Sequence, residues 1–439
     1  MARVYLSFLG TNDYLSCCYF KNDKKLENVR FVQQATLKFF CDDWTLEDRI
    51  LIFTTDEAYR KNWLNDGHQD HEGKILKQRG LRYCIKSLKL LPSVHRVAIP
   101  EGKTEQEIWD IFQIVYDSLR IDDEVVIDIT HAFRSIPMLA VVVLNYAKVM
   151  KKIALHGIYY GAFEVLGSIQ EARRVPATER LVPVFDLAAF DQLLDWTLAV
   201  DRFLGAGDAK AVSALATKAV MPILKDSKGG DAAAAAIKKM ADSLENYTRN
   251  LATCRILEID QSVVSLRERI EKSRHLDLVK PLFHLFEPIE QQVREFKGDI
   301  VGDGIQAAKW CLECNLIQQG VTILFETLIT YLLVRVGAGY LDEGLRNAAS
   351  SAAQLYSQNK PENKWKGDAA IHAGITKKIM KLCAKNTEVA KLIDRLREVR
   401  NDLNHSGYKK GSLKARDLEK KFRSELKRAA LLCRTSDNG

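Results

Sequence analysis

Short apolar segments alternate with amphipathic segments from the N-terminus to about residue 170. Four apolar segments predict strands, and each is followed by polar residues: Arg3–Leu9, Arg49–Thr54, His95–Ile99 and Glu124–Ile129. Helical periodicity lies between them, for example over Glu105–Leu119 and Ser135–Met150. Strands that are apolar throughout and separated by helices are typical of a parallel sheet covered on both faces. The N-terminal part is therefore predicted to be an α/β domain.

The pattern changes after residue 154. Leu155–Phe163 and Val182–Phe185 are strand-like, and from Asp186 onward the periodicity is helical. Asp231 opens an Ala-rich stretch whose periodicity predicts a continuous helix toward Arg274, long enough to reach between domains. Further helical stretches are Asp186–Leu204, Asp303–Val336, Ile375–His405 and Leu413–Cys433. We predict two domains, an α/β domain over 1–185 and an all-α domain over 186–439.

Composition describes an ordinary globular protein, with 47% hydrophobic and 28% charged residues. The N-terminus lacks the features of a secretory signal, and the longest apolar stretch, Ile136–Ala147, is too short to span a bilayer. A cytoplasmic protein without membrane contact is expected. The nine cysteines are scattered, which argues against a disulfide framework. We expect Cys311 and Cys314 to be core residues, and no metal site is predicted from the His68 and His71 pair.

Positive charge is concentrated near the C-terminus. The whole chain carries a net charge of +8, whereas residues 360–434 contain 21 Lys or Arg against 9 Asp or Glu, a local net charge of +12. The rest of the chain is therefore slightly acidic, at −4. This asymmetry predicts a polyanion-binding site in the C-terminal part, and a solvated helical face is the alternative.

The strand ends of the N-terminal domain carry polar residues suited to an anionic ligand. In parallel sheets, ligands bind beyond the carboxyl ends of the strands, at the point where the strand order reverses. The segment Asp128–Pro137 runs from a strand into a helix and offers hydroxyls, cationic side chains and helix N-terminal amides, which suit phosphate or ribose. The chain contains no GxGxxG or GxxxxGK[ST] motif, which disfavours an ordinary dinucleotide or P-loop site. A capped helix with a surface His and Arg is the alternative.

Near the other end, Arg400–His405 places weak helix formers where an amphipathic helix would otherwise continue. A frayed helix end is the simple interpretation. If the segment is helical, Arg400 and His405 point about 140° apart, because five residues turn the helix by about 500°. Asn401 and His405 share a face. Because Arg400 points away from that face, one copy of the chain cannot easily bring Arg400 and His405 to one phosphate.

Together, these segments resemble a known family. Asp128-Ile-Thr-His-Ala-Phe-Arg-Ser-Ile-Pro137 resembles the DxTHG signature of CRISPR-associated proteins with a CARF domain, a Rossmann-like sensor of cyclic oligoadenylates. RNDLNH matches the Rx4–6H signature of HEPN ribonucleases, and Cys314–Glu326 is similar to the helix that precedes it. The ordered pair covers essentially the whole chain. The resemblance implies a CARF domain over 1–185 and a helical linker with a HEPN domain over 186–439.

The resemblance implies an endoribonuclease of type III CRISPR defence that a cyclic oligoadenylate activates. RNA supplies its own nucleophile, the 2′-hydroxyl, so catalysis needs no metal or other cofactor. His405 would be the acid/base group, Arg400 the clamp on phosphate charge, and Asn401 and Asn404 orienting groups. The family pattern is a composite site between two protomers, so a homodimer acting on single-stranded RNA is expected.

The resemblance also implies a ligand site in the sensor domain, with cyclic tetra-adenylate favoured and cyclic hexa-adenylate as the alternative. The expected contacts are Gly10, Thr11, Asn12, Thr55, Lys103, Thr130, His131, Arg134 and Ser135. Ala132 stands where the signature has Gly, which costs on the order of 1 kcal/mol if that position needs a positive φ, so the ring size stays open. Some such sensors also cleave their ligand, and that question stays open too.

Two other functions fit parts of the sequence. One is a ligand-responsive regulator that binds nucleic acid without cutting it. The other is a flavodoxin-like enzyme whose helical half only dimerises, which leaves the C-terminal charge unexplained.

Overall fold

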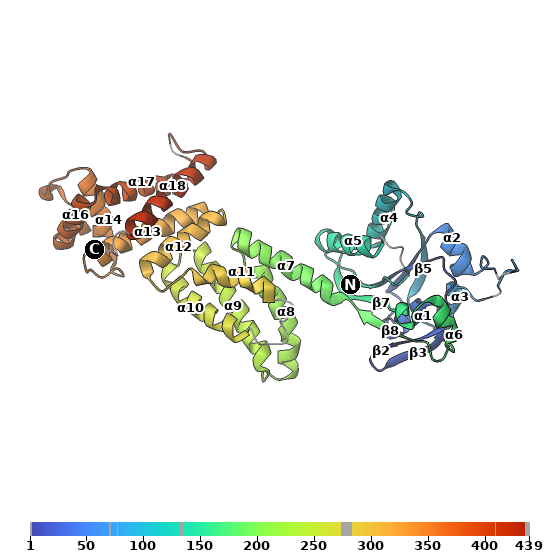
Figure 1. The fold of residues 1–439 in the computed structure, drawn as a ribbon. Coiled ribbons are helices and arrows are strands. Elements are labelled where there is room, and N and C mark those ends of the chain that lie inside the picture. Colours follow the sequence, from blue (N-terminus) through green and yellow to red (C-terminus); the bar gives the residue numbers. More distant parts are fainter. Residues whose placement is uncertain are drawn as a thin grey trace. The chain divides into compact units, whose positions relative to one another are not determined.

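A computed structural model describes residues 2–69, 72–76, 78–131, 136–273, 283–408 and 410–434. The chain divides into two compact units, Met1–Gln192 and Leu193–Gly439, with the boundary inside helix α7 (Ala188–Ala206) (Figure 1). The first unit is built on a mixed, mainly parallel sheet, and the described part of the second is helical. The predicted fold class is confirmed.

The sheet has eight strands in the order β3-β2-β8-β7-β6-β1-β4-β5. Their bounds are β1 (Arg3–Leu9), β2 (Cys17–Lys21), β3 (Lys24–Val29), β4 (Arg49–Thr54), β5 (Ser93–Ala98), β6 (Glu124–Asp128), β7 (Ala154–Gly161) and β8 (Leu181–Asp186). Strands β5, β4, β1, β6 and β7 are parallel, whereas β8 is antiparallel to β7 and β3 is antiparallel to β2. The six expected strands are present. The β2–β3 hairpin was not predicted, because β3 is mostly exposed and charged and lacks an apolar run.

Helices cover both faces of this sheet, as β1 illustrates. Tyr5 and Leu9 pack on one face with α1 (Val32–Phe40) and α3 (Leu81–Ser87). The alternate residues Leu6 and Phe8 pack on the other face, against α4 (Glu105–Ser118) and α5 (Ile136–Lys151). Because successive strand residues point to opposite faces, β1 lies at the centre of two hydrophobic cores. The remaining short elements are α2 (Asp56–Ala58), the π-helix η1 (Tyr59–Leu64), η2 (Phe163–Leu166) and α6 (Ile169–Arg174).

Helices make up the described part of the second unit, and α12, α14, α16, α17 and α18 pack against α13. Their bounds are α8 (Lys210–Asp226), α9 (Ala232–Ala252), α10 (Ile256–Ser273), α11 (Phe283–Arg294), α12 (Ile300–Glu313), α13 (Ile317–Arg335), α14 (Glu343–Ser357), η4 (Glu362–Lys364), α15 (Asp368–Ile371), α16 (Ala373–Lys385), α17 (Thr387–Asn404) and α18 (Ala415–Arg434). By length and composition α13 could cross a membrane, but 67% of its apolar window is buried inside this unit. Its apolar character is therefore that of a central core helix.

Several predicted helices are in fact interrupted. The stretch from Asp231 toward Arg274 contains two helices, α9 and α10, which pack against each other, so the prediction of one long helix reaching between domains was wrong. The reversal follows Cys254, whose φ is +57°, and a similar break between α12 and α13 contains Asn315, with a φ of +58°. A left-handed residue ends a helix, whereas apolar periodicity continues across the break because both helices bury a face. A third break, at Asn386, separates α16 from α17.

Cys311 and Cys314 are core residues, as predicted. Cys311 and Cys314 are buried, free thiols, and burial raises the pKa of each. His68 is buried and its Nε2 lies 2.9 Å from Oδ1 of Asn62. The described residues contain no cluster of three or more metal-ligating side chains, and His71 lies outside the residues that the structure describes.

Candidate functional site

The carboxyl ends of β1 and β6 meet at the point where the strand order reverses. These strands are neighbours, with Ser7 paired to Asp128. A Cβ atom placed on Gly10 would lie 3.2 Å from the carbonyl oxygen of His131 and 2.4 Å from the hydroxyl of Tyr14. Only glycine fits this close approach. Two groups of predicted ligand contacts, Gly10–Asn12 and Thr130–His131, are therefore brought together.

Asp128 fixes the turn that follows β6. Its carboxylate is fully buried and accepts hydrogen bonds from the amide of Thr130 at 3.0 Å, the hydroxyl of Thr130 at 2.6 Å and the hydroxyl of Ser7 at 3.1 Å. Burial raises the pKa of this carboxyl, and the hydrogen bonds oppose that shift. The Thr130 hydroxyl also accepts from the amide of Gly161 at 2.8 Å. Thr130 is thus held by the fold, and its hydroxyl is already engaged.

His131 stacks on Tyr14, with ring centroids 3.9 Å apart. The histidine is half-buried, but its Nε2 atom is closed off from solvent and has no hydrogen-bond partner among the described residues. Burial lowers the pKa of His131 to about 3 and raises that of Tyr14. The pair therefore places neutral aromatic rings, of a kind that stacks with a nucleobase, at the carboxyl ends of β1 and β6. We call these strand ends, with Gly10–Asn12, Thr130 and His131, the candidate ligand edge.

A clamp that the sequence did not predict holds the loop after β1. Asn62, on the π-helix η1, is fully buried and donates to the carbonyl oxygens of Gly10 at 2.7 Å and Asn12 at 2.9 Å. Arg30 donates to the carbonyl of Tyr14 at 3.3 Å, to Asp13 at 3.1 Å and to Oδ1 of Asn62 at 3.4 Å. Together, Asn62 and Arg30 fix the backbone that carries Thr11 and Asn12.

The remaining predicted contacts are placed less centrally. Thr55 is buried, and its hydroxyl caps α2 by accepting from the amide of Ala58 at 3.2 Å. Lys103 is exposed and lies beyond the end of β5, two strands away from β1. Ala132, Arg134 and Ser135 lie outside the described residues. The role of these positions in ligand binding stays a prediction.

In the helical unit, Arg400 is held by two neighbouring residues of α13. Its guanidinium donates to Oε1 of Glu326 at 3.0 Å and lies 4.0 Å from the ring centroid of Phe325. The other carboxylate oxygen of Glu326 accepts from Arg346 of α14 at 2.6 Å. Arg397, one turn before Arg400, lies over the same Phe325 ring at 5.8 Å. Glu326 is the last residue of Cys314–Glu326, the segment that is similar to the helix before the RxxxxH motif in the HEPN family. Its pairing with Arg400 was not predicted.

His405 lies at the exposed end of α17. The helical hydrogen bonding extends to its amide, which donates to the carbonyl of Asn401 at 3.1 Å. Asn401, Asn404 and His405 are all exposed, whereas Asp402 is buried and accepts from the amide of Leu413 at 2.8 Å, which pins the following turn. Because helical geometry persists to His405, Arg400 and His405 project from different sides of α17. The structure thus brings Asn401 and His405 to one face and leaves Arg400 on another.

Comparison with known proteins bears on the first unit. Residues 4–164 match the family model described as the CARF domain of the CRISPR system endoribonuclease Csx1. The N-terminal unit is a CARF domain. The chain is also similar to CRISPR-associated protein MJ1674 of Methanocaldococcus jannaschii, at 25% identity over 238 residues, which cover 52% of this chain and 32% of the relative. It spans about a third of the length of that curated relative.

CARF domains generally bind cyclic oligoadenylates, the ligand class predicted for the first unit. The matched residues include β1, β4, β5 and β6 and therefore the whole candidate ligand edge. Tyr14 and Asn62 of the CARF domain escaped prediction. Tyr14 follows a loop whose path is not encoded by periodicity, and Asn62 gives no signal except its position shortly after a strand end.

Proposed function

We propose that the chain is an endoribonuclease that cleaves single-stranded RNA when its CARF domain binds a cyclic oligoadenylate, within type III CRISPR antiviral defence. The observation that carries this proposal is that α17 holds Arg400 against Glu326 on one side and exposes His405 on another side, at the end of the same helix. An arginine held by a carboxylate over an aromatic ring is preorganised to bind phosphate. The CARF domain supplies the ligand class, and cyclic tetra-adenylate is the favoured ring.

The proposed chemistry uses this chain, its substrate and solvent water. The 2′-hydroxyl of RNA attacks the adjacent phosphorus as its proton passes to solvent water, and the bond to the 5′-oxygen of the next nucleotide breaks, leaving a 2′,3′-cyclic phosphate and a 5′-hydroxyl. Arg400 stabilises negative charge on the phosphorane, and His405 donates the proton that the departing 5′-oxygen needs. Asn401, on the same face as His405, orients the substrate, and Asn404 contacts it from the adjoining face.

The site is composite in this proposal, because Arg400 and His405 project from different sides of one helix. Two copies related by a two-fold axis can place Arg400 of one copy opposite His405 of the other. The CARF domain offers a surface for such pairing on α5. Met138, Val142, Tyr146 and Val149 recur at helical spacing and are 74%, 52%, 45% and 78% exposed. An apolar stripe of this kind on a helix face is typical of a protein–protein interface.

The α5 stripe begins soon after the candidate ligand edge in the sequence. Its first residue, Met138, follows His131 by seven positions. On the neighbouring α4, the exposed Trp109 continues the apolar surface through Phe112, whose ring centroid is 5.7 Å from that of Tyr146. Pairing of two α5 helices would bring two candidate ligand edges near one axis, as a two-fold symmetric ring requires. Ligand binding would then change activity by favouring one arrangement of the two copies over another.

A cleavage assay tests this function. Labelled single-stranded RNA is incubated in EDTA with and without cyclic tetra-adenylate or cyclic hexa-adenylate, with wild type and His405→Ala. We expect ring-dependent cleavage by wild type, 2′,3′-cyclic phosphate ends, and intact DNA of the same sequence, which lacks the 2′-hydroxyl. Full activity of His405→Ala or a strict need for divalent metal would overturn the mechanism. Intact RNA with retained binding would favour the non-cleaving regulator.

A mixing experiment tests the composite site. Arg400→Ala and His405→Ala should each be inactive alone. After exchange of protomers in an equal mixture, half of the dimers pair the two variants, and one of their two sites is intact, so about a quarter of wild-type activity should return. No recovery, although protomer exchange is verified with differently tagged chains, would place Arg400 and His405 in one copy.

A further inference from the structure

Helix α18 carries a row of cations on the side that faces away from the core. Arg416, Lys420, Arg423 and Lys427 are all exposed and follow one another at intervals of four, three and four residues. At 100° per residue they fall within about 60° of the helix circumference and extend over about 16 Å along its axis. The apolar residues Phe422, Leu426 and Ala429 are buried on another side of α18, which packs against α12, α13 and α17. We call these four cations the α18 row.

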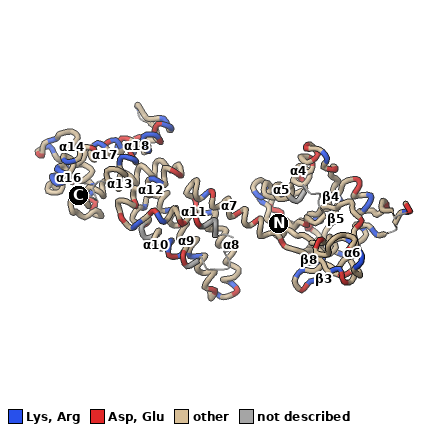
Figure 2. The backbone as a smooth tube through the Cα atoms, in the orientation of Figure 1, with Lys and Arg blue, Asp and Glu red and all other residues tan. Residues whose placement is uncertain are grey.

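The α18 row is not balanced by acids in the way that other cations of this helix are. Toward α17, Lys421 pairs with Glu398 at 3.9 Å and Arg428 with Glu388 at 3.9 Å. In the row only Arg423 has a partner, Glu419 at 2.9 Å, whereas the other three make no ion pair within the described part of the chain. A solvated helix face stabilised by its own charges would pair them at i,i+4 spacing. Figure 2 shows the Lys and Arg residues that recur along α17 and α18.

An exposed aromatic residue lies between this row and His405. Tyr408 is 95% exposed, and its amide donates to the carbonyl of His405 at 2.8 Å, which fixes its backbone beside the proposed acid. Leu413, just before α18, is anchored through Asp402 at the end of α17. Along the chain, His405 and Tyr408 therefore precede the α18 row, and hydrogen bonds hold the backbone at Tyr408 and at Leu413.

We infer that Tyr408 and the α18 row form a binding surface for single-stranded RNA that leads away from the cleavage site. Cations spaced along a line bind successive phosphates, and an exposed aromatic ring stacks on a base, which together are the features of single-strand binding without sequence preference. A duplex hides its base faces and offers Tyr408 no partner. This surface would hold the substrate of the proposed nuclease. It rests on the proposed function only in that cleavage is the reason for binding RNA.

Binding is measured on full-length His405→Ala, so that no cleavage intervenes. Fluorescent single-stranded RNA is titrated at several salt concentrations, and the slope of log affinity against log salt is compared between variants. Each phosphate contact on a single strand contributes about 0.7 to that slope. The triple variant Arg416→Gln, Lys420→Gln, Lys427→Gln should therefore flatten it by about 2. Tyr408→Ala should weaken binding by about 5- to 100-fold, and Tyr408→Phe should restore it.

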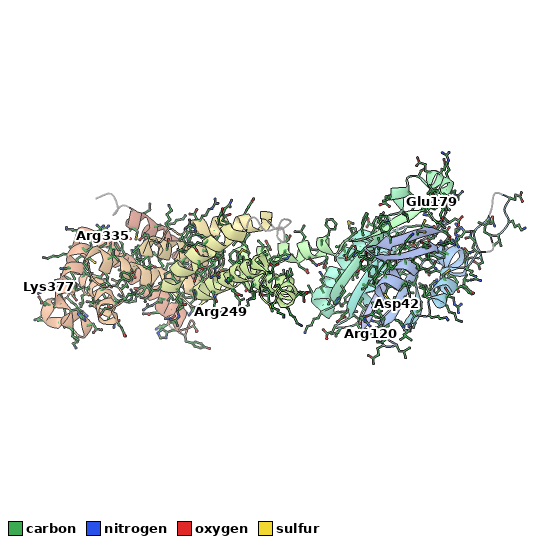
Figure 3. All side chains as sticks on the ribbon, turned by 90° about the horizontal axis from the view of Figure 1, so that it is seen from below. Asp42, Arg120, Glu179, Arg249, Arg335 and Lys377 are labelled. Atoms are coloured by element: carbon green, nitrogen blue, oxygen red, sulfur yellow. The ribbon has the colours of Figure 1, made fainter. Side chains whose placement is uncertain are left out.

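A matched control separates the α18 row from the general positive field of the unit. Lys378, Lys381 and Lys385 are exposed on α16, which packs against α14 and α17. Their neighbour Lys377 is labelled in Figure 3. Replacing these three lysines by Gln removes the same charge, and the slope should change by much less. An equal change in both triple variants, or duplex RNA bound as tightly as single-stranded RNA, would overturn the inference.

Failure of the proposed function is distinguishable from failure of this inference. If wild type does not cleave RNA but the α18 and Tyr408 variants lose binding selectively, the RNA-binding surface is supported and the nuclease function is refuted. If wild type cleaves and these variants bind as His405→Ala does, the RNA lies elsewhere and the surface is refuted.

Discussion

Replacing Glu326 by Gln tests whether this carboxylate positions Arg400. Glu326 accepts one hydrogen bond from Arg400 and one from Arg346, and the two arginines lose an ionic partner when the charge is removed. Arg346 keeps other partners, since it also donates to Thr330 Oγ1 at 3.0 Å and to the Tyr340 carbonyl at 2.9 Å. A Gln side chain can still accept a hydrogen bond through its amide oxygen, but it offers neither arginine a charged partner, and the other contact that holds Arg400 among the described residues is with the Phe325 ring. The substitution should therefore loosen Arg400 and leave Arg346 in place.

The expected magnitudes follow from solvent exposure. The side chains of Arg400 and Glu326 are 27% and 38% exposed, so solvent screens the ion pair. Each pair then contributes about 0.5–1 kcal/mol to stability, and losing both lowers the free energy of unfolding by about 1–2 kcal/mol. That corresponds to a melting temperature lower by roughly 2–6 °C for a unit of this size. Cleavage should fall further, by about 10- to 100-fold, because a misplaced phosphate clamp raises the barrier directly.

The assay compares initial cleavage rates at saturating activator with melting curves of the same preparations. Glu388→Gln is the matched control, because Glu388 pairs with Arg395 on the same helix and is 45% exposed. We expect both variants to lose similar stability and only Glu326→Gln to lose cleavage. Cleavage by Glu326→Gln at or above the wild-type rate would refute the reasoning. Glu326 would then not position Arg400 for phosphate, and above that rate it would compete with phosphate for Arg400.

Three further predictions concern the CARF domain. Burial lowers the pKa of His131 to about 3, below its ordinary 6.5, so the unfolded chain takes up a proton that the folded chain resists. The contribution of neutral His131 to the free energy of unfolding should be fully present above about pH 6.5 and fall by up to about 1.4 kcal/mol per pH unit as the pH drops toward 3. In urea unfolding measured against pH, His131→Phe should flatten this slope. An unchanged slope would exclude His131 as its source. Asn62→Ala should raise the cyclic oligoadenylate concentration for half-maximal activation about tenfold, because two loop carbonyls lose their donor; equal activation curves would show that the loop needs no clamp. Val149→Asp should shift the chain toward monomer in light scattering, whereas Leu46→Asp, at a residue equally exposed at 78%, should not. Equal behaviour of these two variants would remove α5 from the interface.

Sequence alone determined the elements whose signal is local. Continuous apolar runs such as β1 and β6 indicated buried strands, and they were located to within a residue or two. Arg400–His405 was identified as an unusual helix end, and α17 indeed ends at Asn404. The polar residues at strand ends followed from a general rule of parallel sheets, so Gly10 and His131 could be grouped before their contact was known.

Tertiary structure decided everything that depends on partners distant in the chain. Asn62 bonds to Gly10 across 52 residues, and Arg400 bonds to Glu326 across 74 residues. No periodicity records such a pairing, because a pattern reports only which face of a segment is buried. The same limit explains the false continuity of α9 and α10, whose apolar faces stay in phase across a left-handed turn. The buried face of each element can therefore be predicted from the local sequence, whereas the hydrogen-bond partners in the candidate sites depend on how the chain brings distant segments together.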